Sequence, residues 1–125
     1  MVAVMLVPTI ALSMLQASIT APTSAFRGCL HTAVDKAKTD KVGGDKIEDY
    51  LRTSCTVEMG TLKNALVAFR MQNGMGKKAA ADDAAMTVDD YISTPADNYK
   101  FMLDLDAKNA KPAAAAATSP QTPKP

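Results

Sequence analysis

Residues 26–37 read FRGCLHTAVDKA, and the spacing of their apolar side chains decides the fold. Apolar residues recur at intervals of three and four, which is the spacing of one face of an α-helix. They are Phe26, Cys29, Leu30, Ala33, Val34 and Ala37. The pattern predicts an amphipathic helix that begins after an N-cap at Thr23 or Ser24 and ends at Thr39, before a turn at 42–44.

The same spacing predicts three further helices, at about 45–72, 77–93 and 95–109. Asp45 is the expected N-cap of the first of these, and Pro95 is the expected first residue of the last. In the last helix the residues expected to face the core are Tyr99, Met102, Leu103 and Ala107, with Phe101 and Leu105 partly exposed.

Two features locate breaks between these helices. The segment 53–61 is rich in threonine and contains Gly60, so it is a weak part of the helix over 45–72, where a kink or break is expected. Asn73 and Gly74 favour the left-handed conformation that ends a helix. No segment has the alternating pattern of a strand. We therefore predict an all-α fold, a small antiparallel bundle of three to four helices over residues 26–110.

The two ends of the chain differ from its middle. Residues 2–21 carry no charge and are mostly apolar, and small residues follow up to Ala25. This pattern is typical of a secretory signal peptide over 1–25, with cleavage after Ala17 as an alternative, although it lacks the usual basic residues at its start. An uncleaved anchor or a buried helix are the other interpretations. Residues 111–125 are rich in proline and alanine and are predicted to be a disordered tail.

Export gives the two cysteines a role, because oxidising compartments allow disulfides to form. Cys29 lies 11 residues before Asp40 and Cys55 lies 10 residues after Asp45, so both are about 15–16 Å from the same turn in an antiparallel hairpin. Both cysteines also lie on apolar faces. We predict a Cys29–Cys55 disulfide in a periplasmic or secreted protein, the alternative being two buried free thiols.

Cys29 and His31 do not form a metal or catalytic pair on a regular helix, because residues two apart point about 200° apart. The sequence has no other histidine, so a zinc site would lack ligands. Familiar enzyme motifs are also missing from the sequence. We therefore expect no catalytic residue, no resident cofactor and an exposed His31.

Two other residue classes offer candidate sites. Met71 and Met75 could supply soft thioether ligands to Cu(I), although methionines more often fill gaps in a core. Residues 79–106 contain seven Asp and one Lys, whereas 27–78 contain ten Lys and Arg against six acids. We expect the aspartates Asp82, Asp83, Asp89 and Asp90 to form a solvated face that pairs across the bundle with basic helices.

The net charge of +1 and the lack of basic runs argue against nucleic-acid binding. A membrane contact is expected only through the leader, if it is uncleaved.

The chain resembles small, uncharacterised, exported helical bacterial proteins. The resemblance rests on the leader, the Cys29/Cys55 pair, the break at 73–75 followed by KKAAADDAAM, and the segment 90–99, and it covers most of residues 26–103. It implies no particular activity. The expected function is that of a structural or protein-interaction module with an unidentified protein partner; the alternative is a copper-binding protein that uses methionines, and an enzyme ranks third.

Overall fold

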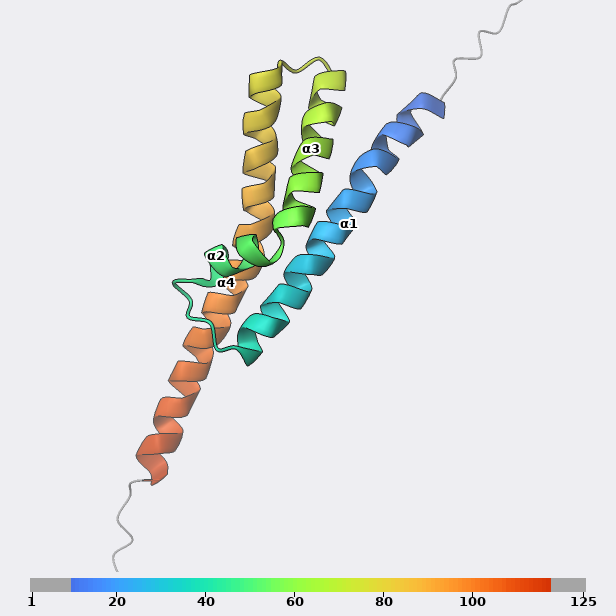
Figure 1. The fold of residues 1–125 in the computed structure, drawn as a ribbon. Helices are drawn as coiled ribbons and strands as arrows, with labels where there is room; N and C mark the ends of the chain where they lie inside the picture. The colour runs from blue at the N-terminus through green and yellow to red at the C-terminus, as the bar shows by residue number, and fades with distance from the viewer. Residues whose placement is uncertain (1–9, 118–125) are drawn as a thin grey trace, which may run out of the picture.

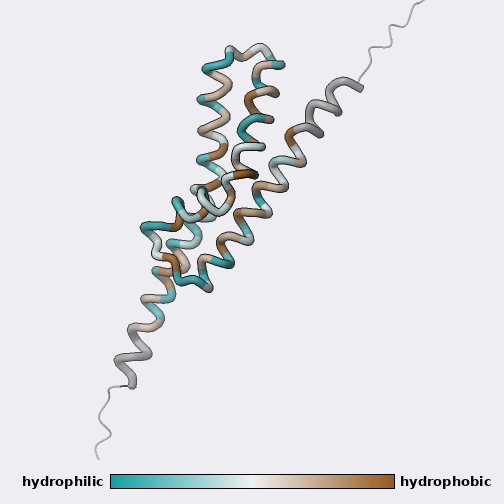
Figure 2. The backbone as a smooth tube through the Cα atoms, in the orientation of Figure 1, coloured by the Kyte–Doolittle hydropathy of each residue, from teal (hydrophilic) through white to brown (hydrophobic). Residues whose placement is uncertain are grey.

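The computed structural model describes the backbone of residues 10–117 and the side chains of residues 19–110. The described part is all-α, as predicted, and contains four helices (Figure 1). They are α1 (Ile10–Thr39), α2 (Ile47–Ser54), α3 (Thr56–Gln72) and α4 (Lys77–Ala117). Along each helix, hydrophobic segments alternate with hydrophilic ones (Figure 2), which is the amphipathic pattern from which the bundle was predicted.

The three long helices pack side by side. The helix α3 runs antiparallel to α1 and to α4, so α1 and α4 run in the same direction (Figure 1). Two contacts confirm that α1 and α4 run in the same direction. The Phe26 and Tyr91 rings meet edge to face with centroids 6.3 Å apart. Farther along both helices, the Tyr99 hydroxyl lies 3.2 Å from the Ala37 carbonyl oxygen. The core lies between these helices and the short α2.

The predicted apolar faces supply most of the core. The buried residues include Phe26, Leu30, Ala33, Ala37, Ile47, Leu51, Cys55, Leu62, Leu66, Ala84, Val88, Ile92, Ala96 and Tyr99. Ala96 was not expected among them. Five alanines and one cysteine are buried beside the larger side chains, because small residues let helix backbones approach closely.

The first helix begins earlier than predicted. The expected N-cap at Thr23 or Ser24 is wrong, because α1 already runs from Ile10 through both residues. The Thr23 hydroxyl instead donates a hydrogen bond to the Ile19 carbonyl one turn back, at 2.8 Å. Residues 1–9 of the predicted signal peptide lie outside the described residues.

The helix predicted over 45–72 is two helices. It breaks at Cys55, inside the segment expected to be weak, where the backbone leaves the helical conformation (φ −116°, ψ 29°). The Asp45 cap is also wrong, since α2 begins after Lys46 and no side chain caps it. The Asp45 carboxylate lies instead over Gly43, where a Cβ atom would come within 2.6 Å of it.

The break predicted at Thr94 and Pro95 is absent, because α4 passes through both residues. Ile92, Ala96 and Tyr99 continue one buried face across the proline, and this burial outweighs the backbone hydrogen bond that a proline cannot donate. The axis of α4 changes direction about halfway along its length (Figure 1), and an interior proline is a known cause of such bends.

The end of α4 extends beyond the bundle. Met102 and Leu103, which were expected in the core, are 49% and 36% exposed, because α1 has ended before α4 reaches this level. Phe101 and Leu105 are exposed as expected, at 62% and 38%. The helix continues to Ala117, past residue 111 where the tail was expected to begin, and residues 118–125 lie outside the described residues.

Candidate functional site

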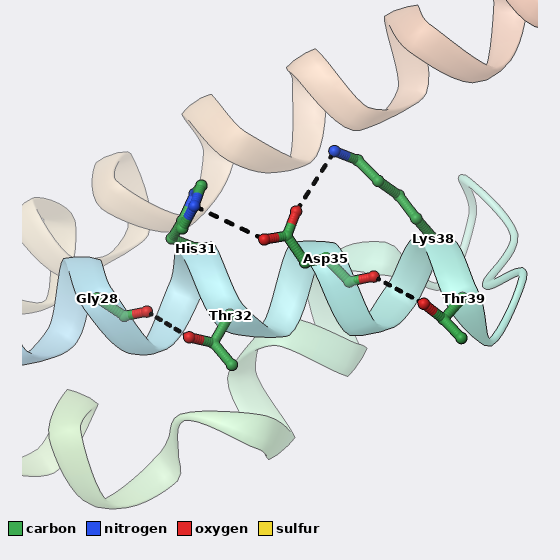
Figure 3. Close-up of polar contacts among 6 residues, drawn as sticks. All are labelled: Gly28, His31, Thr32, Asp35, Lys38 and Thr39. Carbon is green, nitrogen blue, oxygen red and sulfur yellow. Dashed lines mark hydrogen bonds and ion pairs between the residues drawn. The ribbon is translucent and has the colours of Figure 1, made fainter.

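Cys29 and His31 have separate environments. Cys29 forms the predicted disulfide with Cys55, with Cα atoms 5.9 Å apart. The His31 side chain is 82% exposed, and its Nε2 atom lies 3.6 Å from the Asp35 carboxylate. Figure 3 shows His31 and Lys38 on either side of Asp35, on the side of α1 that faces α4. The two residues do not share a site.

The disulfide joins α1 to the junction between α2 and α3. Cys55 is fully buried and ends one helix where the next begins. The covalent bond therefore fixes the least regular point of the α2–α3 segment against α1, which is a structural role.

The candidate methionines lie at the turn between α3 and α4. Met71 is 44% exposed and Met75 is half-buried, and the backbone N–H of Met75 donates to the Arg70 carbonyl in that turn. Over the described part of the chain, no three or more His, Cys, Asp or Glu side chains gather into a group that could hold a metal ion. Copper binding by the two thioethers stays a prediction.

Of the four aspartates expected to pair across the bundle, Asp83 and Asp89 do so, whereas Asp82 and Asp90 do not. Asp83 lies 2.7 Å from the Arg70 guanidinium of α3, and Asp89 lies 2.9 Å from the Arg52 guanidinium of α2. Asp82 pairs with Lys78 one turn earlier on its own helix. The pairs of Asp83 and Asp89 orient α4 on α3 and α2. Asp90 lies instead on the side of α4 that faces α1.

A groove of about 760 Å³ lies between α1 and α4. Its lining from α1 is Arg27, Leu30, His31, Val34 and Lys38, and its lining from α4 is Thr87, Asp90, Tyr91, Thr94, Pro95, Asn98, Tyr99 and Met102. Leu30 and Tyr99 are buried in its floor. This groove is the candidate functional site.

The groove has an apolar floor and edges that carry charges of both signs. Arg27, His31 and Lys38 lie along α1, whereas Asp90 is the acidic residue that α4 contributes. Within residues 19–110, Arg27 has no ion-pair partner, whereas Lys38 and His31 both lie beside Asp35. The Tyr99 hydroxyl is directed at the Ala37 carbonyl of α1 and the Val42 carbonyl of the α1–α2 loop, so it is already hydrogen-bonded. The groove suits an apolar ligand, and Arg27 is the cation at its margin that has no ion-pair partner among the described residues.

Sequence reasoning missed this groove for a specific reason. Its α4 wall is formed by Tyr91, Pro95, Asn98 and Met102, whose spacing of four, three and four marks one face of a continuous helix. Placing a helix boundary at Pro95 divided that face into two unrelated segments. The spacing itself was present in the sequence.

No helix within residues 10–117 is both long enough and apolar enough to cross a bilayer. The chain matches no protein-family model, no curated protein and no solved structure.

Proposed function

We propose that this chain is an exported, non-catalytic interaction module whose groove between α1 and α4 binds another protein. The observation that carries the proposal is the groove itself, a concave surface with an apolar floor that opens beside exposed apolar side chains at the end of α4. Exposed apolar surface of this kind marks interaction sites in small proteins.

Two features support export. The Cys29–Cys55 disulfide is of the kind that persists in oxidising compartments. Residues 2–21 are uncharged and mostly apolar, as in a secretory leader. Intact mass measured under non-reducing conditions on protein from its native host tests this step. We expect a two-hydrogen deficit and an N-terminus near Phe26; a chain that retains residues 1–25 would contradict export with cleavage.

The binding surface is tested with a photoactivated cross-linking residue placed at Asn98, which lines the groove. A matched control places the same residue at Lys63, which is exposed on α3 and lies outside the groove. We expect protein adducts from position 98 in native cells and few from position 63. Equal yields at both positions would show that the groove has no special role.

The second candidate function is Cu(I) binding at Met71 and Met75. The exposure of Met71 at the α3–α4 turn supports it, because an accessible thioether is required. Copper titration of the wild type against the Met71→Ala/Met75→Ala variant separates the two functions. Equal Cu(I) affinities of the wild type and the variant would show that Met71 and Met75 do not bind copper.

A further inference from the structure

The two cysteines of the disulfide differ in their access to solvent. Cys55 is fully buried, whereas Cys29 is half-buried. The Cys29 Sγ atom lies 3.7 Å from the Ser54 carbonyl oxygen, and this contact is exposed. A reagent in solution therefore approaches the bond from the Cys29 side, because the other cysteine lies inside the core.

A depression of about 480 Å³ opens beside Cys29. It is formed by α1 and the α2–α3 segment, and Cys29 lines it whereas Cys55 does not. Most of its other lining residues are small, namely Ala25, Gly28, Thr32, Ala33 and Ser54. These side chains leave room beside the Cys29 sulfur that larger residues would fill.

Gly28 keeps this space open at a cost to the helix. It lies in the interior of α1, where a glycine is less favourable than an alanine. A Cβ atom at this position would meet nothing within 4 Å, so no close approach of another segment requires the glycine. The missing side chain instead leaves the depression open beside Cys29.

The charges around the bond act in opposite directions. Lys36 and Glu58 both line the depression, so a cation and an anion lie at its margin. Cys55 ends α2 and begins α3, so the carbonyl groups of one helix and the N–H groups of the next oppose each other in their effect on its sulfur. Access, rather than charge, therefore decides which sulfur reacts.

We propose that the Cys29–Cys55 bond undergoes thiol–disulfide exchange in the folded protein, with Cys29 as the site of attack and a dithiol as the reagent. The reagent is either a small dithiol or the C-x-x-C pair of a redox protein, since both supply the same chemistry.

The exchange has two steps. A thiolate of the reagent attacks the Cys29 sulfur and forms a mixed disulfide, while the Cys29–Cys55 bond breaks and its electron pair passes to the Cys55 sulfur, which takes up a proton. The second thiolate of the reagent then attacks the reagent's own sulfur in the mixed disulfide, and Cys29 leaves as a thiolate that water protonates. The reagent becomes a disulfide, and the protein gains the two electrons that the reagent loses.

Opening the bond releases the α2–α3 junction from α1. The released Cys55 thiol is compatible with its buried position, because a free cysteine packs as a small apolar side chain. A dithiol that reaches Cys29 therefore controls the covalent tie that holds these helices together.

The first test maps the attacked sulfur in the full chain with its disulfide intact. Reduced glutathione is the probe, because a monothiol has no second thiol to resolve the mixed disulfide, which is trapped with acid and mapped by mass spectrometry. We expect adducts on Cys29 to exceed those on Cys55 about tenfold or more in the folded chain, and about equal adducts in urea. Equal adducts in the folded chain would overturn the proposal, as would the same preference in the unfolded chain.

The second test closes the depression. Gly28→Leu adds a side chain beside Cys29 and should slow reduction by dithiothreitol about tenfold or more. Gly60→Leu is the matched control, because Gly60 is also a helical glycine at which a Cβ would meet nothing within 4 Å, and it lies outside the depression. It should leave the rate unchanged. Equal rates in the two variants would overturn the proposal.

A third measurement separates attack on the folded chain from attack after unfolding. The rate of reduction by dithiothreitol is measured in urea concentrations below the unfolding transition. Direct attack on the folded chain gives a rate that stays constant there, whatever the stability of the variant. A rate that rises with the unfolded fraction would show that the bond is reached only through unfolding, and would overturn the proposal.

A redox protein whose C-x-x-C motif has serine in place of its second cysteine distinguishes the two sources of dithiol. A mixed disulfide between its remaining cysteine and Cys29 would identify a redox protein as a competent reagent. Reaction with dithiothreitol alone would restrict the exchange to small dithiols, and reaction of the folded chain with neither would overturn the proposal.

Discussion

The hydroxyl oxygen of Tyr99 lies 2.7 Å from the carbonyl oxygen of Val42, and this hydrogen bond joins α4 to the loop that follows α1. The Ala37 carbonyl is 3.2 Å away, so the single hydroxyl proton has two acceptors within reach. Tyr99 is 2% exposed and Ala37 is fully buried, whereas Val42 is half-buried. The contact sets the level at which α1 ends beside α4, and hence where the groove ends and the exposed residues 101–110 begin.

Replacing Tyr99 with phenylalanine should lower the free energy of unfolding by about 1 kcal/mol, because the Val42 carbonyl loses its hydrogen-bond partner. Urea denaturation followed by circular dichroism measures the change. Tyr91→Phe is the control, since the Tyr91 hydroxyl has no hydrogen-bond partner among the described residues, and it should be close to neutral. Equal effects of the two substitutions would show that the Tyr99 bond adds nothing.

Removing the disulfide should destabilise the chain strongly. The bond closes a loop between residues 26 positions apart, for which the chain-entropy model gives about 3–4 kcal/mol. The Cys29→Ala/Cys55→Ala variant and the reduced wild type should both lose stability of this order in urea denaturation. A loss below about 1 kcal/mol in both would mean that the unfolded chain already holds these segments close together.

At the two helix ends that contain a residue with positive φ, introducing a glycine should raise the free energy of unfolding and removing one should lower it. Both helices end with the same pair of backbone hydrogen bonds. At the end of α1, Val42 donates to Ala37 and Lys41 to Lys38; at the end of α3, Met75 donates to Arg70 and Gly74 to Met71. The residue in the left-handed conformation is Lys41 (φ 54°) in the first and Gly74 (φ 92°) in the second.

Lys41→Gly should therefore raise the free energy of unfolding by about 0.5–1 kcal/mol, because glycine adopts this conformation without steric cost. Gly74→Ala should lower it by about 1 kcal/mol for the converse reason. Thermal unfolding of the two variants beside the wild type provides the measurement. A stabilising Gly74→Ala or a destabilising Lys41→Gly would contradict the assignment of strain to these positions.

If the proposed leader is removed, the position of the cut should affect stability. Ile19 packs against the core, and Phe26, about two turns farther along α1, is fully buried. A chain that begins at Ser18, after the alternative cleavage at Ala17, keeps Ile19, whereas a chain that begins at Phe26 loses it. The shorter chain should be less stable by about 1–2 kcal/mol.

Denaturant unfolding of the two chains tests this expectation, and Ile19→Ala in the longer chain should reproduce most of the difference. If both chains unfold at the same denaturant concentration, the contact of Ile19 with the core has no energetic weight.

Stability should fall at alkaline pH in part through Tyr50. Partial burial raises the pKa of Tyr50 above 10.0, and the Asp40 carboxylate, which accepts a hydrogen bond from its hydroxyl at 3.1 Å, raises it further. Because the folded state holds the proton more tightly than the unfolded state, this contribution is complete below the unfolded pKa and is lost as pH rises through the folded pKa.

Free energies of unfolding measured from about pH 9 upward should therefore decline less steeply in Tyr50→Phe than in the wild type. The difference between the two curves isolates Tyr50 from the other titrating groups. Parallel curves would show that the Tyr50 pKa is the same in both states.

The sequence by itself determined the fold class, most of the core and the disulfide. Apolar spacing identified the buried faces from Phe26 to Ala37 and from Ile47 to Leu66. A helix that buries one face carries apolar residues every three or four positions along its sequence. It also placed both cysteines on buried faces. The register argument assumed a continuous helix over 45–72, yet the pairing survived the break because the break falls at Cys55 itself.

Only the tertiary structure decided where helices continue and which apolar residues stay exposed. Local preference at Pro95 favoured a boundary, but burial of Ile92, Ala96 and Tyr99 against other helices makes α4 continuous. The exposure of Met102 and Leu105 depends on where α1 ends, which is a contact between segments distant in sequence. The exposed residues 101–110 of α4 arise from this difference in where the two helices end, and no local pattern encodes the level at which two packed helices end.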